Sequence, residues 1–136
     1  MAHPALGSAL TAPFWQAAAD RVLALPHCTA TGLAFWPPSP LSPYDSGAAV
    51  EWRPVPGGGT LQARVVFRRS FVAELANRIP YAVGLVELDA GPRLQVHIGA
   101  PDDASAPQPG QRVEIRFVEI VPGAGPVPIA QREGGA

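Results

Sequence analysis

The fold class of this chain is decided by the stretch YAVGLV at residues 81–86. Every position in it is apolar, so both faces of the segment need cover, which is typical of a strand that is covered on two sides. We therefore expect residues 81–86 to form the central strand of a sheet.

Three other segments alternate apolar and polar residues, which is the two-residue period of a sheet with one buried face. Their apolar positions are Leu61, Ala63, Val65 and Phe67, then Leu94, Val96 and Ile98, then Val113, Ile115 and Phe117. Residues 51–55, which precede a turn of three glycines, supply a fifth strand. Five strands with one long connection predict a mainly β protein built on a small, partly open barrel of the OB type.

The residues before these strands predict a different kind of structure. Thr11 and Pro13 predict the start of a short helix, because a Thr hydroxyl can cap free backbone N–H groups and Pro is tolerated in the first turn. Residues 23–28 predict a short strand. Residues 29–49 carry turn signals without periodicity, so we expect an irregular module there, with bulky anchors at Phe35 and Trp36.

Charge limits the classes of partner. The chain has 10 basic residues, all of them Arg, and 11 acidic residues, for a formal charge of −1. A nucleic acid or an anionic membrane needs a polybasic surface, so neither is expected as a partner. The single cysteine, Cys28, excludes an intrachain disulfide and favours a reducing compartment. The first 19 residues contain no Lys or Arg, and prolines interrupt the uncharged residues 22–44, so we expect a cytoplasmic protein without a membrane span.

No set of residues in the sequence predicts catalysis. The three histidines are scattered along the chain: His3, His27 and His97. Cys28 has no base near it other than its neighbour in the sequence, so an inert thiol is expected. Asp102 and Asp103 lie in a loop of Pro, Ser and Ala, where adjacent carboxylates are usually solvated and form Asx turns. We therefore expect a protein that is not an enzyme.

Several strings of residues, taken in order, resemble the bacterial and archaeal acyl-CoA-associated OB-fold proteins. That family carries an N-terminal helix, a rubredoxin-like zinc ribbon and a C-terminal OB barrel. The matching strings are Phe14-Trp15, Cys28 with Gly32, Phe35-Trp36-Pro37-Pro38, Glu51-Trp52, Gly59-Thr60 and PYAVGLVELDAGPR at residues 80–93. The last string is the most specific, because it places an apolar strand, an acidic pair and a Gly turn in the family's order and spacing.

The resemblance covers residues 13–121 and implies how the chain is divided. Residues 1–12 would be a flexible N-terminus, and residues 13–50 would form the helix and a degenerate zinc-ribbon-like module. Residues 51–121 would form the OB barrel. Residues 122–136 have too little apolar bulk to offset the entropy of ordering them, so we expect a flexible tail.

The ribbon departs from the family pattern at its metal ligands. The family holds zinc with two Cys-x-x-Cys pairs, and the four corresponding positions here are Cys28, Thr31, Ser42 and Asp45. Neutral hydroxyls are poor zinc ligands, so one thiolate and one carboxylate cannot fill a tetrahedral shell. We expect no zinc and no other metal or cofactor. Packing of the aromatic residues and prolines would then hold the module together.

An arginine cluster is the most suggestive binding feature. Arg64, Arg68 and Arg69 precede Phe71, and two guanidinium groups beside an aromatic ring could hold the phosphates of CoA while the ring covers the adenine or an acyl chain. The alternative is a solvated strand edge. Three apolar residues in the predicted helical turn at 70–77 would equally serve as a protein contact: Phe71, Val72 and Leu75.

The resemblance implies a non-catalytic accessory subunit. Members of that family occur beside thiolase-like enzymes, aldolases and hydratases that act on CoA thioesters, so such an enzyme is the expected partner and acyl-CoA a candidate ligand. A protein that binds single-stranded nucleic acid is the alternative, although it would need a positive groove. A stand-alone enzyme is the third hypothesis, and it lacks a nucleophile with a base or a metal set. The oligomeric state stays open.

Overall fold

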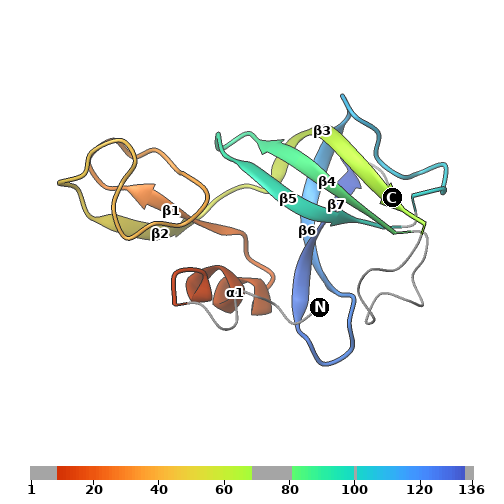
Figure 1. Ribbon diagram of the computed structural model, residues 1–136, viewed down its shortest axis with the longest axis horizontal. Helices are drawn as coiled ribbons and strands as arrows, with labels where there is room; N and C mark the ends of the chain where they lie inside the picture. The colour runs from red at the N-terminus through yellow and green to blue at the C-terminus, as the bar shows by residue number, and fades with distance from the viewer. Residues whose placement is uncertain (1–8, 69–80, 100, 134–136) are drawn as a thin grey trace.

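The computed structural model describes residues 9–68, 81–99 and 101–133, and this part of the chain is mainly β (Figure 1). One short helix precedes the strands. In chain order the elements are α1 (Ala12–Ala19), β1 (Ala24–Cys28), β2 (Val50–Pro54), β3 (Gly58–Phe67), β4 (Tyr81–Leu88), β5 (Arg93–Ile98), β6 (Arg112–Glu119) and β7 (Pro126–Arg132).

Five strands form a closed barrel in the order β3-β4-β5-β7-β6, with β6 pairing back onto β3. The pairs are antiparallel except for β5 and β7, which run parallel. The predicted mainly β class, with a five-stranded OB-type barrel after a short helix, is confirmed. The barrel is closed, however, where the sequence predicted a partly open one.

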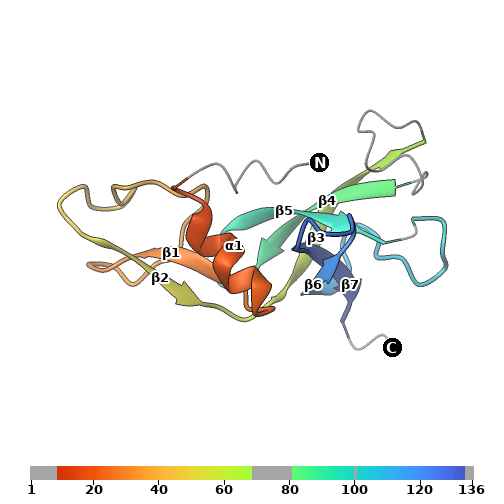
Figure 2. The same ribbon diagram turned by 90° about the horizontal axis from the view of Figure 1, so that it is seen from below.

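The fifth strand of the barrel is not the one that the sequence predicted. Residues 51–55 were expected to join the barrel, but β2 pairs instead with β1 in a separate two-stranded sheet. The predicted boundary between residues 50 and 51 is therefore wrong, because it cuts this sheet. We call residues 24–54 the N-terminal lobe, and Figures 1 and 2 show it extending to one side of the barrel.

The strand that closes the barrel is β7, in a region expected to be a flexible tail. It pairs with β6 along its whole length, and Val127 and Ala130 are buried on it. The expectation failed because it weighed only apolar bulk, whereas β7 also gains seven residues of pairing against a preformed strand. Small side chains are enough on the inside of a narrow barrel.

A β-bulge in β3 changes which residues face the core. The register shifts between Leu61 and Ala63, so the inward positions move by one residue after the bulge. Leu61 is fully buried, but Val65 is 54% exposed and Val66 packs against the core instead. The simple alternation of apolar residues predicted for this segment therefore holds only up to the bulge.

The sequence predicted that both faces of the central strand β4 are covered, and this holds only in part. Its inward side is buried, and its outward side is half-buried up to the exposed Glu87. Gly84 faces inward, and a Cβ atom there would lie 2.7 Å from Leu61 Cδ1 and 2.9 Å from Ile98 Cδ1. A side chain at this position would have to displace the ends of two core side chains, so glycine permits their close packing against β4.

Aromatic packing joins the helix, the lobe and the barrel. Phe14 of α1 is buried, and its ring centroid lies 4.9 Å from that of Trp15, 5.1 Å from that of Trp36 and 6.0 Å from that of Phe117. Trp36 in turn contacts Trp52 of β2 edge to face. In both views α1 lies where lobe and barrel meet (Figures 1 and 2). The three parts of the chain thus share one core cluster.

The end of α1 is held to the barrel by an arginine. Arg21 has a left-handed backbone with φ of 60°, a conformation that glycine usually supplies after a helix. The amide groups of Arg21 and Val22 donate to Ala18 and Ala17, which caps the last turn. The Arg21 guanidinium donates to the carbonyl of Phe117 on β6. This hydrogen bond explains why an arginine occupies position 21, where glycine would be less strained.

Two substitutions on β7 test whether this strand closes the barrel in solution. Ala130→Asp places a charge in the core, where Ala130 is 2% exposed, so we expect it to destabilise the fold by about 3–5 kcal/mol. Gln131→Asp is the matched control, since the neighbouring side chain is exposed and its change should stay within about 0.5 kcal/mol. Urea unfolding followed by tryptophan fluorescence measures both. Equal, small effects would mean that residues 126–132 form a flexible tail after all.

Candidate functional site

The structure places two of the three predicted arginines. Arg64 lies within β3, and Arg68 directly follows the end of that strand. Arg64 Nη1 donates to the carbonyls of Pro101 and Pro107, at 3.3 and 3.4 Å. Arg68 follows the end of the strand and makes two hydrogen bonds to the carboxylate of Asp102, at 3.0 and 3.1 Å. Both side chains therefore hold the connection between β5 and β6 against the end of β3.

The remaining predicted binding residues cannot be placed. The residues that lie outside the described part of the chain are Arg69, Phe71, Val72 and Leu75. The helical turn predicted at residues 70–77 lies there as well. The arginine cluster is thus observed only for its first two members.

The two neighbouring aspartates have separate roles. The Arg68 guanidinium lowers the pKa of Asp102 below its ordinary value, chiefly through the hydrogen bonds between them. Asp103 accepts hydrogen bonds from the amide and the hydroxyl of Ser105, at 2.8 and 2.7 Å, and these lower its pKa as well. The expected Asx turn is present at Asp103. Asp102 is exposed but ion-paired, and not simply solvated as expected.

An aromatic pair that the sequence did not single out lies beside the arginines. Phe67 and Tyr81 pair across β3 and β4, and their rings stack at 5.0 Å with 18° between the planes. Phe67 immediately precedes Arg68. The pairing of the two strands could have revealed this stack only if the bulge in β3 had been known, because the bulge sets the register.

The four degenerate ligand positions meet in the N-terminal lobe. Cys28 is fully buried, and its thiol is hydrogen-bonded to the side chains of Ser42 and Thr31. Ser42 Oγ also accepts the amide of Asp45, at 3.2 Å. The four positions therefore lie near one another, but Asp45 joins the others only through its backbone amide, because its carboxylate accepts the amide of Gly47. Among the described residues, no three His, Cys, Asp or Glu side chains are grouped so that they could hold a metal ion.

The surroundings of Cys28 favour its thiolate. Ser42 Oγ accepts the amides of Tyr44 and Asp45, so its proton is free to donate to Cys28 Sγ. Thr31 Oγ1 likewise accepts the amide of Leu33. The hydrogen bonds from these hydroxyls and from backbone amides lower the pKa of the Cys28 thiol from 9.0 to about 7, against the opposing effect of burial.

The histidines do not assemble into a site with this thiol. His27 is buried, and its Nδ1 lies 2.8 Å from the carbonyl oxygen of Leu25 on the same strand. His97 lies on β5 opposite Val83, on the half-buried outer side of the barrel. His3 is outside the described residues. The expectation that the histidines are scattered is confirmed for the two that the structure places.

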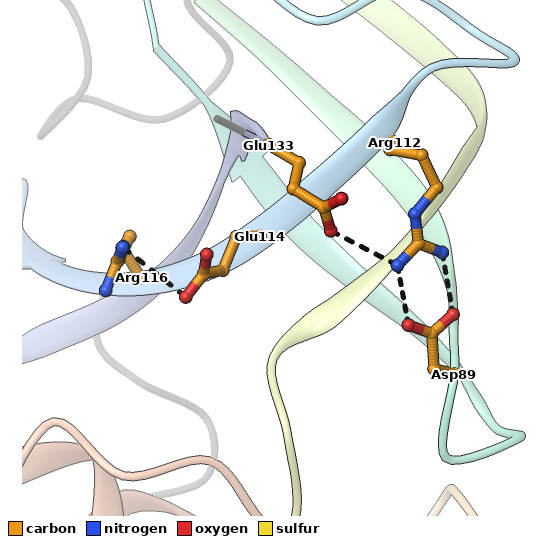
Figure 3. Close-up of polar contacts among 5 residues, drawn as sticks. All are labelled: Asp89, Arg112, Glu114, Arg116 and Glu133. Carbon is orange, nitrogen blue, oxygen red and sulfur yellow. Dashed lines mark hydrogen bonds and ion pairs between the residues drawn. The ribbon is translucent and has the colours of Figure 1, made fainter. Parts of the chain in front are cut away.

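A second charged group, which the sequence did not reveal, lies where four barrel strands begin or end (Figure 3). Arg112 makes two hydrogen bonds to Asp89, at 2.6 and 2.7 Å, and a third to Glu133, at 3.2 Å. These contacts raise the pKa of Arg112 and lower that of Asp89. A side chain at Gly58 would crowd this charged group, because its Cβ atom would lie 2.9 Å from Asp89 Oδ2. The group ties the β4–β5 turn to β6 and to the end of β7.

The titration of Cys28 is a direct test of the lobe's geometry. Because folding lowers the pKa of this thiol from 9.0 to about 7, its thiolate stabilises the fold fully above about pH 9, and this stabilisation is lost as the pH falls through 7. We expect the difference in unfolding free energy between the unaltered chain and Cys28→Ala to grow from pH 7 to pH 9. Urea unfolding at a series of pH values measures it.

A milder variant serves as the control for that titration. Thr31→Val removes one hydroxyl donor and keeps the side-chain shape, so the thiolate absorbance should appear at a higher pH than in the unaltered chain. A stability difference that does not change with pH, together with a thiol pKa near the ordinary value of 9.0 in both chains, would contradict the hydrogen bonding described for Cys28.

No helix of the described residues has the length and apolar character needed to cross a membrane.

A search of the curated proteins found no match to the chain. Among solved structures, a chain of the Ltp2–ChsH2(DUF35) aldolase is similar to this chain, with a TM-score of 0.78 and 25% sequence identity over 92% of this chain and 95% of that one. The family model of the ChsH2 C-terminal OB-fold domain matches residues 52–118, which contain β3 to β5 and nearly all of β6. Residues 52–118 are therefore similar to the ChsH2 C-terminal OB-fold domain.

Proposed function

We propose that this chain is a non-catalytic accessory subunit that docks on an acyl-CoA-processing enzyme, in the first place an aldolase. The observation that carries the proposal is the similarity to a chain of the Ltp2–ChsH2(DUF35) aldolase, because it extends over 92% of this chain and so includes the lobe as well as the barrel. A thiolase-like enzyme or a hydratase is the other partner class within the same proposal.

The arrangement of reactive side chains supports an accessory role. Cys28 is fully buried, so a substrate cannot reach its sulfur although the surrounding hydroxyls favour the thiolate. The carboxylates of Asp89 and Asp102 are paired with arginines, which keeps them ionised and unsuited to deliver a proton. The chemistry of the complex would therefore belong to the partner.

The charge pattern does not favour the alternative of a nucleic-acid-binding protein. To bind a nucleic acid, four arginines of the described chain would have to give up a carboxylate within 4 Å and bind a phosphate instead. These are Arg53, Arg68, Arg112 and Arg116. An OB fold that binds single strands needs a positive groove along its surface. With a net charge of −1, the chain has no excess of positive charge to form one.

Affinity capture of the tagged chain from the lysate of its own organism tests the accessory role. We expect an aldolase, or another enzyme of CoA thioesters, to be recovered in stoichiometric amount after a moderate-salt wash and identified by mass spectrometry. The captured enzyme is then purified separately and mixed with the chain, and size-exclusion chromatography with light scattering gives the stoichiometry. Recovery of the chain alone, or failure of the purified pair to associate, would contradict the proposal.

Within the same proposal, Arg64 and Arg68 contribute to the binding of acyl-CoA at the partner's site. Both guanidinium groups contact the connection between β5 and β6, and Arg68 follows Phe67, whose ring stacks on that of Tyr81. A phosphate of CoA would replace the Asp102 carboxylate on Arg68, since both anions match the planar guanidinium. Arg69, Phe71, Val72 and Leu75, which follow in the sequence, belong to the same proposal as binding residues.

Two substitutions with opposite effects test this part of the proposal. In the complex, Arg68→Ala should weaken CoA binding about tenfold, the loss of a charge-assisted hydrogen bond, whereas Asp102→Asn should strengthen it by freeing Arg68. Isothermal titration calorimetry with coenzyme A measures both. Arg53→Gln is the control, because it removes an exposed, paired arginine from β2. Equal affinities in all four proteins would contradict a role for Arg68.

A further inference from the structure

The tip of the N-terminal lobe exposes three large apolar side chains. Leu33 is 52% exposed, Leu41 is 58% exposed and Tyr44 is 51% exposed. They belong to two loop segments that lie together, because the Tyr44 hydroxyl donates to the carbonyl of Ala34 at 3.3 Å. Three of the large apolar side chains that the described chain exposes are thus gathered in one small part of it.

Hydrogen bonds hold the backbone that carries these side chains. The amide of Leu33 donates to Thr31 Oγ1, and its carbonyl accepts the amide of Cys28 at 2.9 Å. The amide of Leu41 donates to Ser39 Oγ, at 3.2 Å. The Tyr44 ring also packs edge to face on Phe35, at 6.4 Å. The apolar side chains are therefore presented by ordered loops, so little entropy would be lost when a partner covers them.

The same part of the chain is without charge. Residues 22–44 contain no Asp, Glu, Lys or Arg, and Asp45 is the first charged residue after Arg21. The buried centre of a protein interface is depleted of charged residues, and Tyr is enriched there. A surface of this chemistry matches an uncharged, apolar protein surface, and it offers nothing to a phosphate, a nucleic acid or an acidic peptide.

We infer that Leu33, Leu41 and Tyr44 form the docking surface for an apolar, uncharged patch on the partner enzyme. The inference rests on the proposed function and names the surface by which the chain docks. The lobe extends from the barrel (Figure 1), so a larger enzyme can enclose it on several sides.

A second copy of the chain fits this surface less well. Three half-exposed side chains provide on the order of 300 Å², against about 800 Å² per partner in a standard interface. Two extended lobes that meet at their tips would add little to that area. An enzyme surface shaped around the lobe can also cover the loops beside the three side chains.

Substitutions to aspartate test the surface. Leu33→Asp and Leu41→Asp place a charge in the proposed interface and should each raise the dissociation constant for the purified partner enzyme at least tenfold. Leu10→Asp is the matched control, because Leu10 is 47% exposed and lies outside the lobe, so this change should leave the affinity within about twofold. Thermal unfolding of each variant should match that of the unaltered chain, since all three positions are exposed.

The outcomes separate this inference from the proposed function. Weaker binding of the lobe variants alone supports the docking surface. Binding of Leu33→Asp and Leu41→Asp as tight as that of the unaltered chain would overturn it while leaving the accessory role in place. A dimer of the unaltered chain that Leu41→Asp dissociates would identify a second copy as the occupant and overturn the inference. If the unaltered chain binds no partner enzyme, the proposed function fails, and the inference fails with it.

Discussion

The burial of Phe14 holds the parts of this protein in one arrangement. Its ring contacts Trp36 of the lobe and Phe117 of the barrel, and Trp36 contacts Trp52 in turn. Full burial of one aromatic side chain stabilises a fold by about 3 kcal/mol, and edge-to-face ring contacts add to that. Without this cluster the two-stranded lobe would be too small to hold its position, because an isolated pair of strands is marginally stable in water.

The fixed position of the lobe has consequences for function. A surface that docks on another protein is useful only if the rest of the chain is held at a defined distance and angle from it. The aromatic cluster on one side of α1 and the Arg21 contact to Phe117 at its end provide that constraint. The arginines at the end of β3 then have a defined place relative to the docked lobe, which a shared acyl-CoA site would need.

Hydrogen bonds around Cys28 hold the turns of the lobe in place. Gly32, with a φ of +75°, follows Thr31, and its amide donates to the carbonyl of Cys28 at 2.7 Å, so a tight turn closes at this position. The Cys28 thiol accepts hydrogen bonds from the hydroxyls of Ser42 and Thr31. Each hydroxyl is itself fixed by backbone amides, so the cross-link is made by hydrogen bonds and packing in the described lobe.

Much of the fold was predictable because the relevant signals are local. The two-residue alternation in β5 and β6 and the apolar run of β4 marked three barrel strands, and Pro13 marked the helix start. The hydroxyl cap expected from Thr11 is not made, although the helix begins where predicted. Of the candidate site, the sequence singled out Arg64 and Arg68, but not the groups of the β5–β6 connection that both of them contact.

The sequence by itself determined the mainly β class, four of the barrel strands and the low charge of the chain, since each follows from composition or from a short repeating pattern. Only the tertiary structure decided that β2 leaves the barrel and β7 enters it, because strand pairing depends on which backbone edges meet and not on either strand alone. It also decided that Arg112 joins Asp89 and Glu133, and that the bulge in β3 exposes Val65. Residues far apart in the sequence meet at these places only after the barrel has closed.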